Sequence, residues 1–172
     1  MDTEYSDCTG LNVEIGSATD QIGAYLDEGG EGAVYRLQDT DEYVAKILKP
    51  RKRVDKRRKL EQMVGDSLIA PADQDGTVPW TAWPLETVSR LDDGSFVGYA
   101  MPYIDTSEYI DAQRYASQEL RWGKSSRREQ YKPALNLTLT VHWLHQNGYA
   151  VGDLSEQNVR VNSGTVTLID CD

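Results

Sequence analysis

The stretch LHQNGYAVGDLSEQN (residues 144–158), followed by LIDCD (residues 168–172), decides the fold prediction for this chain. Asp153 and Asn158 stand five positions apart in the first stretch, and Asp170 lies in the second. Asp170 follows a short apolar strand that begins after an Asn162-Ser163-Gly164 turn, a sequence typical of a small hairpin.

These three polar residues have the chemistry that phosphoryl transfer from ATP requires. A carboxylate such as Asp153 orients the attacking hydroxyl, and hard oxygen ligands such as Asn158 and Asp170 hold Mg²⁺ against the phosphates. The alternative is an ordinary helix, turn and hairpin, because an aspartate and an asparagine are common in loops.

A glycine-rich segment, DEGGEGAVY (residues 27–35), lies between two strand-like runs near the start of the chain. It predicts a hairpin whose backbone lies close over the phosphates of a nucleotide, since glycine has no Cβ. Gly-Gly pairs also occur in hairpins without that function. The candidate nucleotide contacts in the segment are Gly29, Gly30, Gly32 and Val34.

Lys46 lies among apolar residues in the strand-like run YVAKIL (residues 43–48). Burial of a lysine is costly unless its ammonium group meets an anion such as a phosphate. The alternative is an edge-strand lysine that points to water.

In this order along the chain, the glycine segment, the strand lysine and the polar loop resemble the protein kinase-like family over nearly the whole length. The resemblance implies an α+β fold with an antiparallel five-stranded small lobe and one main helix, followed by the first, mainly helical part of the large lobe. It also implies ATP and Mg²⁺ as cofactors, with ATP between the lobes.

The resemblance assigns roles to individual residues. Lys46 corresponds to the phosphate-binding lysine, and Glu61, in the predicted helix, to its ion-pair partner. Asp153 corresponds to the catalytic aspartate. Asn158 and Asp170 correspond to the metal ligands.

The segment FVGYAMPYI (residues 96–104) resembles the strand that leads into the kinase hinge. There, Met101 is expected to border the adenine pocket, and the backbone of Pro102 and Ile104 to pair with the edge of the base. Val44, in the strand of Lys46, is expected to contact the nucleotide as well.

The departures from the family pattern leave the function open. Val151-Gly152 stands where most protein kinases have His-Arg, and Ser155 where serine/threonine kinases keep a lysine. Asp27 replaces the first loop glycine, and Asp172 replaces the glycine after the metal aspartate. We expect a Ser/Thr-type protein kinase region; the alternatives are a pseudokinase-like nucleotide-binding or interaction module and a small-molecule kinase of the aminoglycoside phosphotransferase type.

Residues 1–20 are polar and acidic without periodicity, which predicts a flexible acidic tail. The resemblance implies a small lobe (21–104) and a partial large lobe (105–172). The chain stops where the family's activation segment begins, so we expect a truncated domain that a further domain or a partner chain completes. Trp83-Pro84, Met101-Pro102 and the Val151-Gly152-Asp153 loop resemble a bacterial and archaeal subgroup of atypical kinases. The predicted strands are 22–27, 32–38, 42–48, 83–89 and 96–102, and the predicted helices are 54–67 and 129–146.

Composition agrees with a cytoplasmic protein, and the resemblance to kinases implies a protein substrate. The 28 acidic and 18 basic residues give a net charge of −10, which argues against a general nucleic-acid or anionic-membrane binder. No apolar run is long enough for a membrane span, and Cys8 and Cys171 are too far apart in sequence to indicate a disulfide framework. A basic stretch, residues 49–59, is either a docking patch for an acidic partner or a solvated helix start.

Overall fold

The computed structural model describes residues 7–68, 80–122 and 127–171. The chain divides into two compact units, which are described separately. The first unit contains the residues up to Leu68 together with Trp83–Tyr103. The second contains the residues directly before Trp83 and the segment Ile104–Cys171.

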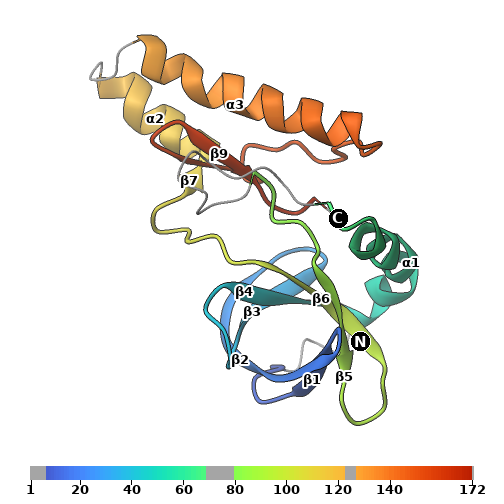
Figure 1. The fold of residues 1–172 in the computed structure, drawn as a ribbon. Helices are drawn as coiled ribbons and strands as arrows, with labels where there is room; N and C mark the ends of the chain where they lie inside the picture. The colour runs from blue at the N-terminus through green and yellow to red at the C-terminus, as the bar shows by residue number, and fades with distance from the viewer. Residues whose placement is uncertain (1–6, 69–79, 123–126, 172) are drawn as a thin grey trace. The chain divides into compact units, whose positions relative to one another are not determined.

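The first unit is a six-stranded antiparallel sheet that closes on itself in the order β1-β2-β3-β4-β6-β5 (Figure 1). Closure depends on β1, which pairs with both β2 and β5. The strands are β1 (Asn12–Ile15), β2 (Ala18–Glu28), β3 (Gly32–Leu37), β4 (Tyr43–Leu48), β5 (Glu86–Arg90) and β6 (Phe96–Pro102).

The expectation of a flexible tail over residues 1–20 is wrong for the part that forms β1 and the start of β2. Asn12 to Ile15 alternate polar and apolar residues, and the side chain of Val13 is fully buried. Gly16, at φ +59°, makes the turn into β2. Residues 1–6 of the expected tail lie outside the described residues.

Apolar side chains fill the interior of this sheet, as the two-residue period of its strands requires. They are Val13, Ile22, Ala33, Tyr35, Leu37, Ala45, Ile47, Val88, Val97 and Ala100. Gly98 permits β6 to approach β4 closely, since a Cβ at this position would lie 2.0 Å from the carbonyl oxygen of Lys46. The spacing of the core strands therefore depends on a glycine outside the glycine-rich loop.

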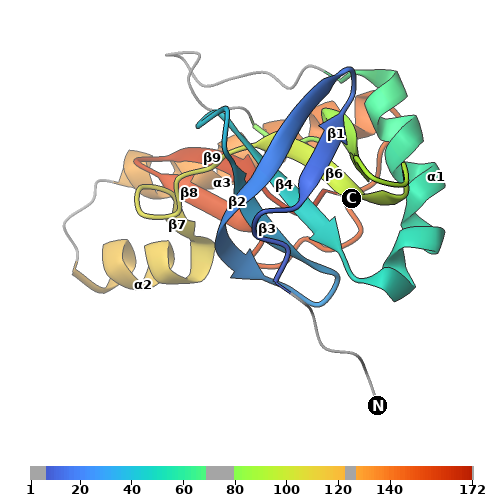
Figure 2. The same cartoon turned by 90° about the horizontal axis from the view of Figure 1, so that it is seen from below.

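Helix α1 (Pro50–Asp66) packs against β5 and β6, and lies beside β6 in both views (Figure 1 and Figure 2). It begins four residues before the predicted start, because Pro50 at the first helical turn has a fixed φ that suits a helix. Leu60 and Met63 are fully buried, and the indole Nε1 of Trp83 donates to the carbonyl oxygen of Met63 at 3.1 Å. This hydrogen bond holds Trp83 against the C-terminal part of α1, and β5 follows Trp83 in the chain.

The second unit combines a three-stranded sheet, in the order β7-β8-β9, with two helices. Its elements are β7 (Ile110–Asp111), α2 (Ala112–Trp122), α3 (Arg127–Gln146), β8 (Val159–Asn162) and β9 (Thr165–Leu168). Helix α3 packs on β9, and the amide of Asn136 donates to the carbonyl oxygen of Gly164 at 2.7 Å. The predicted turn is present, with Ser163 at φ +47° and Gly164 at φ +91°, as a two-residue hairpin turn of the primed type requires.

The α+β class is confirmed, and the five predicted strands correspond to β2 to β6. Within the described ranges, no helix is long and apolar enough to cross a membrane.

Candidate active site

The loop before β8 brings Asp153 and Asn158 together. The carboxamide nitrogen of Asn158 donates to Oδ2 of Asp153 at 3.1 Å and to its carbonyl oxygen at 3.2 Å. The backbone N–H of Asn158 donates to the carbonyl oxygen of Ser155 at 3.1 Å, which closes the intervening turn. Asp153 is exposed and Asn158 is half-buried, so the carboxylate is fixed by Asn158 while it stays accessible to solvent.

Asp170 is linked to the same loop through the backbone. The N–H of Ile169 donates to the carbonyl oxygen of Asn158 at 2.9 Å, so the end of β9 is fixed against the residue before β8. Asp170 has φ +54°, a left-handed conformation that aspartate tolerates better than most residues. The second unit therefore brings together all three of its predicted site residues.

The end of α3 determines where this loop begins. Gly148, at φ +82°, donates to the carbonyl oxygen of His145, and Tyr149 donates to that of Leu144 at 3.0 Å. These are the two bonds of a Schellman motif, which ends a helix with a left-handed glycine. Because Leu144 is buried, the start of the loop is anchored to the core of the unit.

The side chains of Asn158 and Asp170 fit the ligand chemistry of Mg²⁺. The carboxamide nitrogen of Asn158 is occupied by Asp153, whereas its Oδ1 accepts no hydrogen bond from the part of the chain that the structure describes. That oxygen and the Asp170 carboxylate are hard donors of the kind Mg²⁺ selects. No group of three or more His, Cys, Asp or Glu side chains gathers among the described residues, so phosphate and water oxygens would have to complete the coordination.

Lys46 lies on a central strand of the first unit. Its strand, β4, pairs with β3 on one side and β6 on the other, and the lysine is only 3% exposed. Its Nζ lies 5.8 Å from the ring centroid of Tyr99, the residue opposite it on β6. The alternative of an edge-strand lysine in water is therefore wrong, and the burial fits a lysine that meets anions.

Glu61 has a different partner from the predicted one in this structure. It is exposed on α1, and its Oε1 accepts a hydrogen bond from Nε of Arg57, one turn earlier, at 2.7 Å. The faces of α1 explain this position, since Leu60 and Met63 point inward and Glu61 lies to one side of them. Its pairing with Lys46 stays a prediction.

The glycines between β2 and β3 differ in what their backbone requires. A Cβ at Gly32 would lie 2.5 Å from the carbonyl oxygen of Ile47, so packing alone demands a glycine there. A Cβ at Gly30 would meet nothing within 4 Å, and one at Gly29 would just reach Gly32 at 4.0 Å. Gly29 and Gly30 therefore leave room for a ligand, and their packing gives no other reason for glycine.

The predicted adenine contacts fall at the end of β6. Met101 is buried opposite Val44, which is also buried, and Pro102 is half-buried opposite Tyr43. Val34, also half-buried, lies opposite Lys46 on β3. Ile104 is buried within the second unit, after the boundary that follows Tyr103.

Comparison with known proteins links this architecture to kinases. No family model matches the chain. "Protein kinase YegI" of Escherichia coli strain K12 is 28% identical over 174 residues, which cover 94% of this chain and 25% of that protein. The protein of the same name from Escherichia coli O157:H7 is 29% identical over 160 residues, covering 87% of this chain and 23% of that one. The chain thus spans about a quarter of the length of the curated relatives that it matches.

Solved structures agree at the level of the fold. The PknI kinase domain of Mycobacterium tuberculosis superposes with a TM-score of 0.62 at 19% identity, over 96% of this chain and 62% of that chain. A rhoptry kinase of Toxoplasma gondii gives a TM-score of 0.59 at 15% identity, over 99% and 52%. The chain is thus similar in sequence to proteins named protein kinases, and it shares the fold of solved kinase domains. The narrower resemblance to a bacterial and archaeal subgroup stays a prediction.

The contacts between the basic stretch and the glycine-rich loop were not predicted from the sequence. Three lysines of the basic stretch, Lys49, Lys52 and Lys56, contact the glycine-rich loop, where Glu28 and Glu31 receive them. The signal was present in the spacing, because residues three and four apart share one face of a helix. These three lysines are therefore engaged by the loop, whereas the rest of the stretch is mostly exposed, as expected for a solvated helix start.

Proposed function

We propose that the chain is the ATP- and Mg²⁺-dependent catalytic region of a phosphotransferase that acts on hydroxyl groups of proteins. The observation that carries the proposal is the double hydrogen bond from Asn158 to Asp153. It holds a carboxylate at the surface and leaves an amide oxygen for a metal, which are the two groups that the reaction needs side by side.

Each residue has one task in this proposal. Asp153 accepts a hydrogen bond from the acceptor hydroxyl, orients it and takes its proton as transfer proceeds. Lys46 binds the phosphates, and Glu61 turns from Arg57 to hold that lysine when the site assembles. Asn158 and Asp170 would hold Mg²⁺, which neutralises the charge on the transferred phosphoryl group when ATP is bound.

A protein acceptor is supported by the name of the relatives, which are protein kinases. A serine or threonine hydroxyl is the acceptor that we propose. The net charge of −10 argues against a nucleic-acid substrate, since like charges repel.

A second candidate function is a nucleotide-binding module without catalysis. It is favoured by the Glu61–Arg57 pair, which occupies the glutamate that the reaction would use. Asp27, at the first position of the glycine-rich loop, favours a module that acts through protein contacts instead, because a carboxylate there opposes the phosphates of a nucleotide.

The test is a transfer assay with radiolabelled ATP, with casein and myelin basic protein as general protein acceptors and kanamycin as a small-molecule acceptor. We expect label on protein, which Asp153→Asn abolishes while ATP binding persists. Asp39→Asn, an exposed aspartate between β3 and β4, is the matched control and should transfer normally. Equal transfer by Asp153→Asn would refute the catalytic assignment, and ATP binding without transfer by the wild-type chain would favour the binding module.

A further inference from the structure

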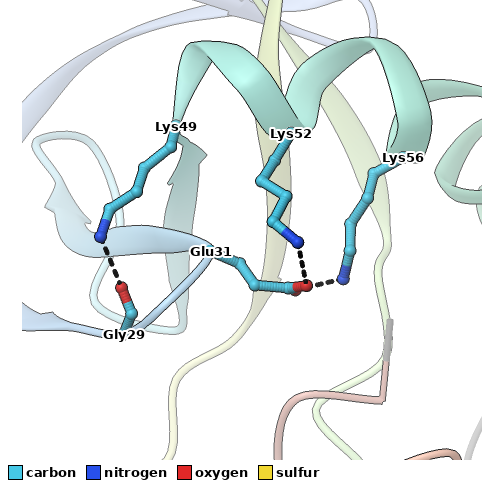
Figure 3. A network of polar contacts seen from close by, with 5 residues as sticks. All are labelled: Gly29, Glu31, Lys49, Lys52 and Lys56. Carbon is cyan, nitrogen blue, oxygen red and sulfur yellow. Dashed lines mark hydrogen bonds and ion pairs between the residues drawn. The ribbon is translucent and has the colours of Figure 1, made fainter. Parts of the chain in front are cut away.

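The glycine-rich loop is tethered to helix α1 by ionic contacts (Figure 3). The carboxylate of Glu31 receives two ammonium groups, that of Lys52 at 3.4 Å and that of Lys56. Lys49 reaches the same loop, where its Nζ lies 3.0 Å from the carbonyl oxygen of Gly29 and 3.0 Å from Oε1 of Glu28. Two carboxylates and one loop carbonyl thus meet three lysines from one segment.

The geometry of α1 makes this possible. Lys49, Lys52 and Lys56 are spaced by three and four residues, so they project from one face at the start of the helix. The backbone adds a further link, because the N–H of Lys49 donates to the carbonyl oxygen of Glu31 at 2.9 Å. The loop is therefore fixed to the helix by main-chain and side-chain contacts together.

The contacts differ from ordinary surface ion pairs. The side chain of Lys56 is 16% exposed and that of Glu31 is 35% exposed, so solvent screens their attraction less than it screens fully exposed charges. One carboxylate shared by two cations is also a network, in which pairs reinforce one another.

Charge in the loop gives the network a consequence for ligand binding. Asp27, Glu28 and Glu31 place three carboxylates in a segment of six residues, Asp27–Gly32, that the proposed function lays over phosphates. Unpaired, these carboxylates would repel a nucleotide. The lysines neutralise Glu28 and Glu31 and hold them toward the helix.

We propose that Glu31 is a positioning residue, which with Lys52 and Lys56 holds the glycine-rich loop in the conformation that receives the phosphates of a nucleotide. The inference rests on the proposed function and deepens it. It assigns a role to the loop's own acidic residue, which otherwise opposes the ligand. Glu31 acts through the loop and does not touch the nucleotide.

The test compares ATP with adenosine, which has the same base and sugar but no phosphates. We expect Glu31→Gln to weaken ATP binding about fivefold, the upper range for one partly exposed ion pair, and to leave adenosine binding unchanged. Glu14→Gln, an exposed glutamate of β1, is the matched control and should change neither. A general loss of structure would weaken both ligands equally, so the ratio separates positioning from stability.

Two further measurements complete the test. In a double-mutant cycle, the single variant Lys56→Met should weaken ATP binding, but adding Lys56→Met to Glu31→Gln should weaken it little further, since both substitutions remove the same interaction. The control is Lys59→Met, at an exposed lysine of the same helix. Amide hydrogen exchange at Gly29 and Gly32, measured without nucleotide, should accelerate in Glu31→Gln. Wild-type ATP affinity in Glu31→Gln would overturn this inference alone, whereas absence of ATP binding by the wild-type chain would overturn it together with the proposed function.

Discussion

Asn158 holds Asp153 by two hydrogen bonds from a single carboxamide nitrogen, one to the carboxylate and one to the carbonyl oxygen of the same residue. Both the side chain and the backbone of Asp153 are therefore fixed by one neighbour. The opposite atom of that carboxamide, Oδ1, is the oxygen that the proposed metal site uses. Orientation of the acceptor hydroxyl and metal binding are thus coupled through Asn158.

This coupling predicts different results for two substitutions. Asn158→Ala removes the donor and the oxygen, so phosphoryl transfer should fall by about a hundredfold or more and the Mg²⁺ requirement should rise. Asn158→Asp keeps an oxygen ligand but loses the donor, so transfer should fall while the Mg²⁺ requirement changes less. Initial rates over a Mg²⁺ series measure both effects. A wild-type rate in Asn158→Ala would contradict the coupling.

Substitution of two glycines of the first unit by alanine should affect stability to different extents. Gly98→Ala places a Cβ against the backbone of Lys46, so we expect the free energy of unfolding to fall by about 1–3 kcal/mol. Gly30→Ala meets open space, so stability should change by less than about 0.5 kcal/mol. Urea unfolding followed by circular dichroism measures both.

ATP binding separates the role of Gly30 from its packing. If the loop lies over the phosphates, Gly30→Ala should weaken ATP binding although the fold is unchanged. Equal ATP affinity in Gly30→Ala and the wild type would show that this glycine makes no close approach to a nucleotide.

The pair between Glu61 and Arg57 predicts a contrast between stability and activity. Both side chains are exposed, so Glu61→Gln should change the free energy of unfolding by less than about 0.5 kcal/mol. If Glu61 leaves Arg57 to hold Lys46, Glu61→Gln should lower the rate of transfer about tenfold or more. This is the order of magnitude expected when a charged contact at a reacting site is lost. Arg57→Gln should preserve or raise transfer, because it releases Glu61. Unchanged transfer in both variants would exclude Glu61 from the site.

The turn between β5 and β6 gives a prediction for acid pH. Arg90 donates to both carboxylate oxygens of Asp92, at 2.9 and 2.7 Å, and these bonds lower the pKa of Asp92 to about 2 from 3.8. Because the pKa of Asp92 is lower in the folded than in the unfolded chain, its carboxylate stabilises the folded state at pH values above the unfolded pKa. That stabilisation is lost as the pH falls from about 4 to about 2. Thermal unfolding midpoints should therefore drop less between about pH 5 and pH 2 in Asp92→Asn than in the wild type. An equal drop in both would show that the Arg90 contact does not persist in solution.

Local sequence signals predicted those parts of the molecule that short-range physics determines. The Asn162-Ser163-Gly164 turn, the strand around Lys46 and the loop from Asp153 to Asn158 follow from turn chemistry, apolar pattern and spacing. The structure brings Asp153, Asn158 and the end of β9 together because these residues are close in sequence and one hairpin connects them. The burial of Lys46 followed from the order of the motifs along the chain, since the apolar strand alone also allowed an edge-strand lysine in water.

Contacts between distant segments were not predictable in this way. Strand β1 is only four residues long, and its pairing with β5 joins residues that are far apart in the chain. Glu31 meets Lys52 and Lys56 only after the loop and α1 have folded. The partner of Glu61 depends on which face α1 turns inward, which Leu60 and Met63 decide.

The proposed function requires that the chain bind ATP through Lys46 and a metal held at Asp170. The most direct measurement is calorimetric titration of ATP into the wild-type chain, Lys46→Ala and Asp170→Ala, with Mg²⁺ present and with Mg²⁺ chelated. Saturable binding that Mg²⁺ strengthens, and that both substitutions weaken, is the predicted result. Absence of ATP binding by a wild-type chain shown to be folded would contradict it.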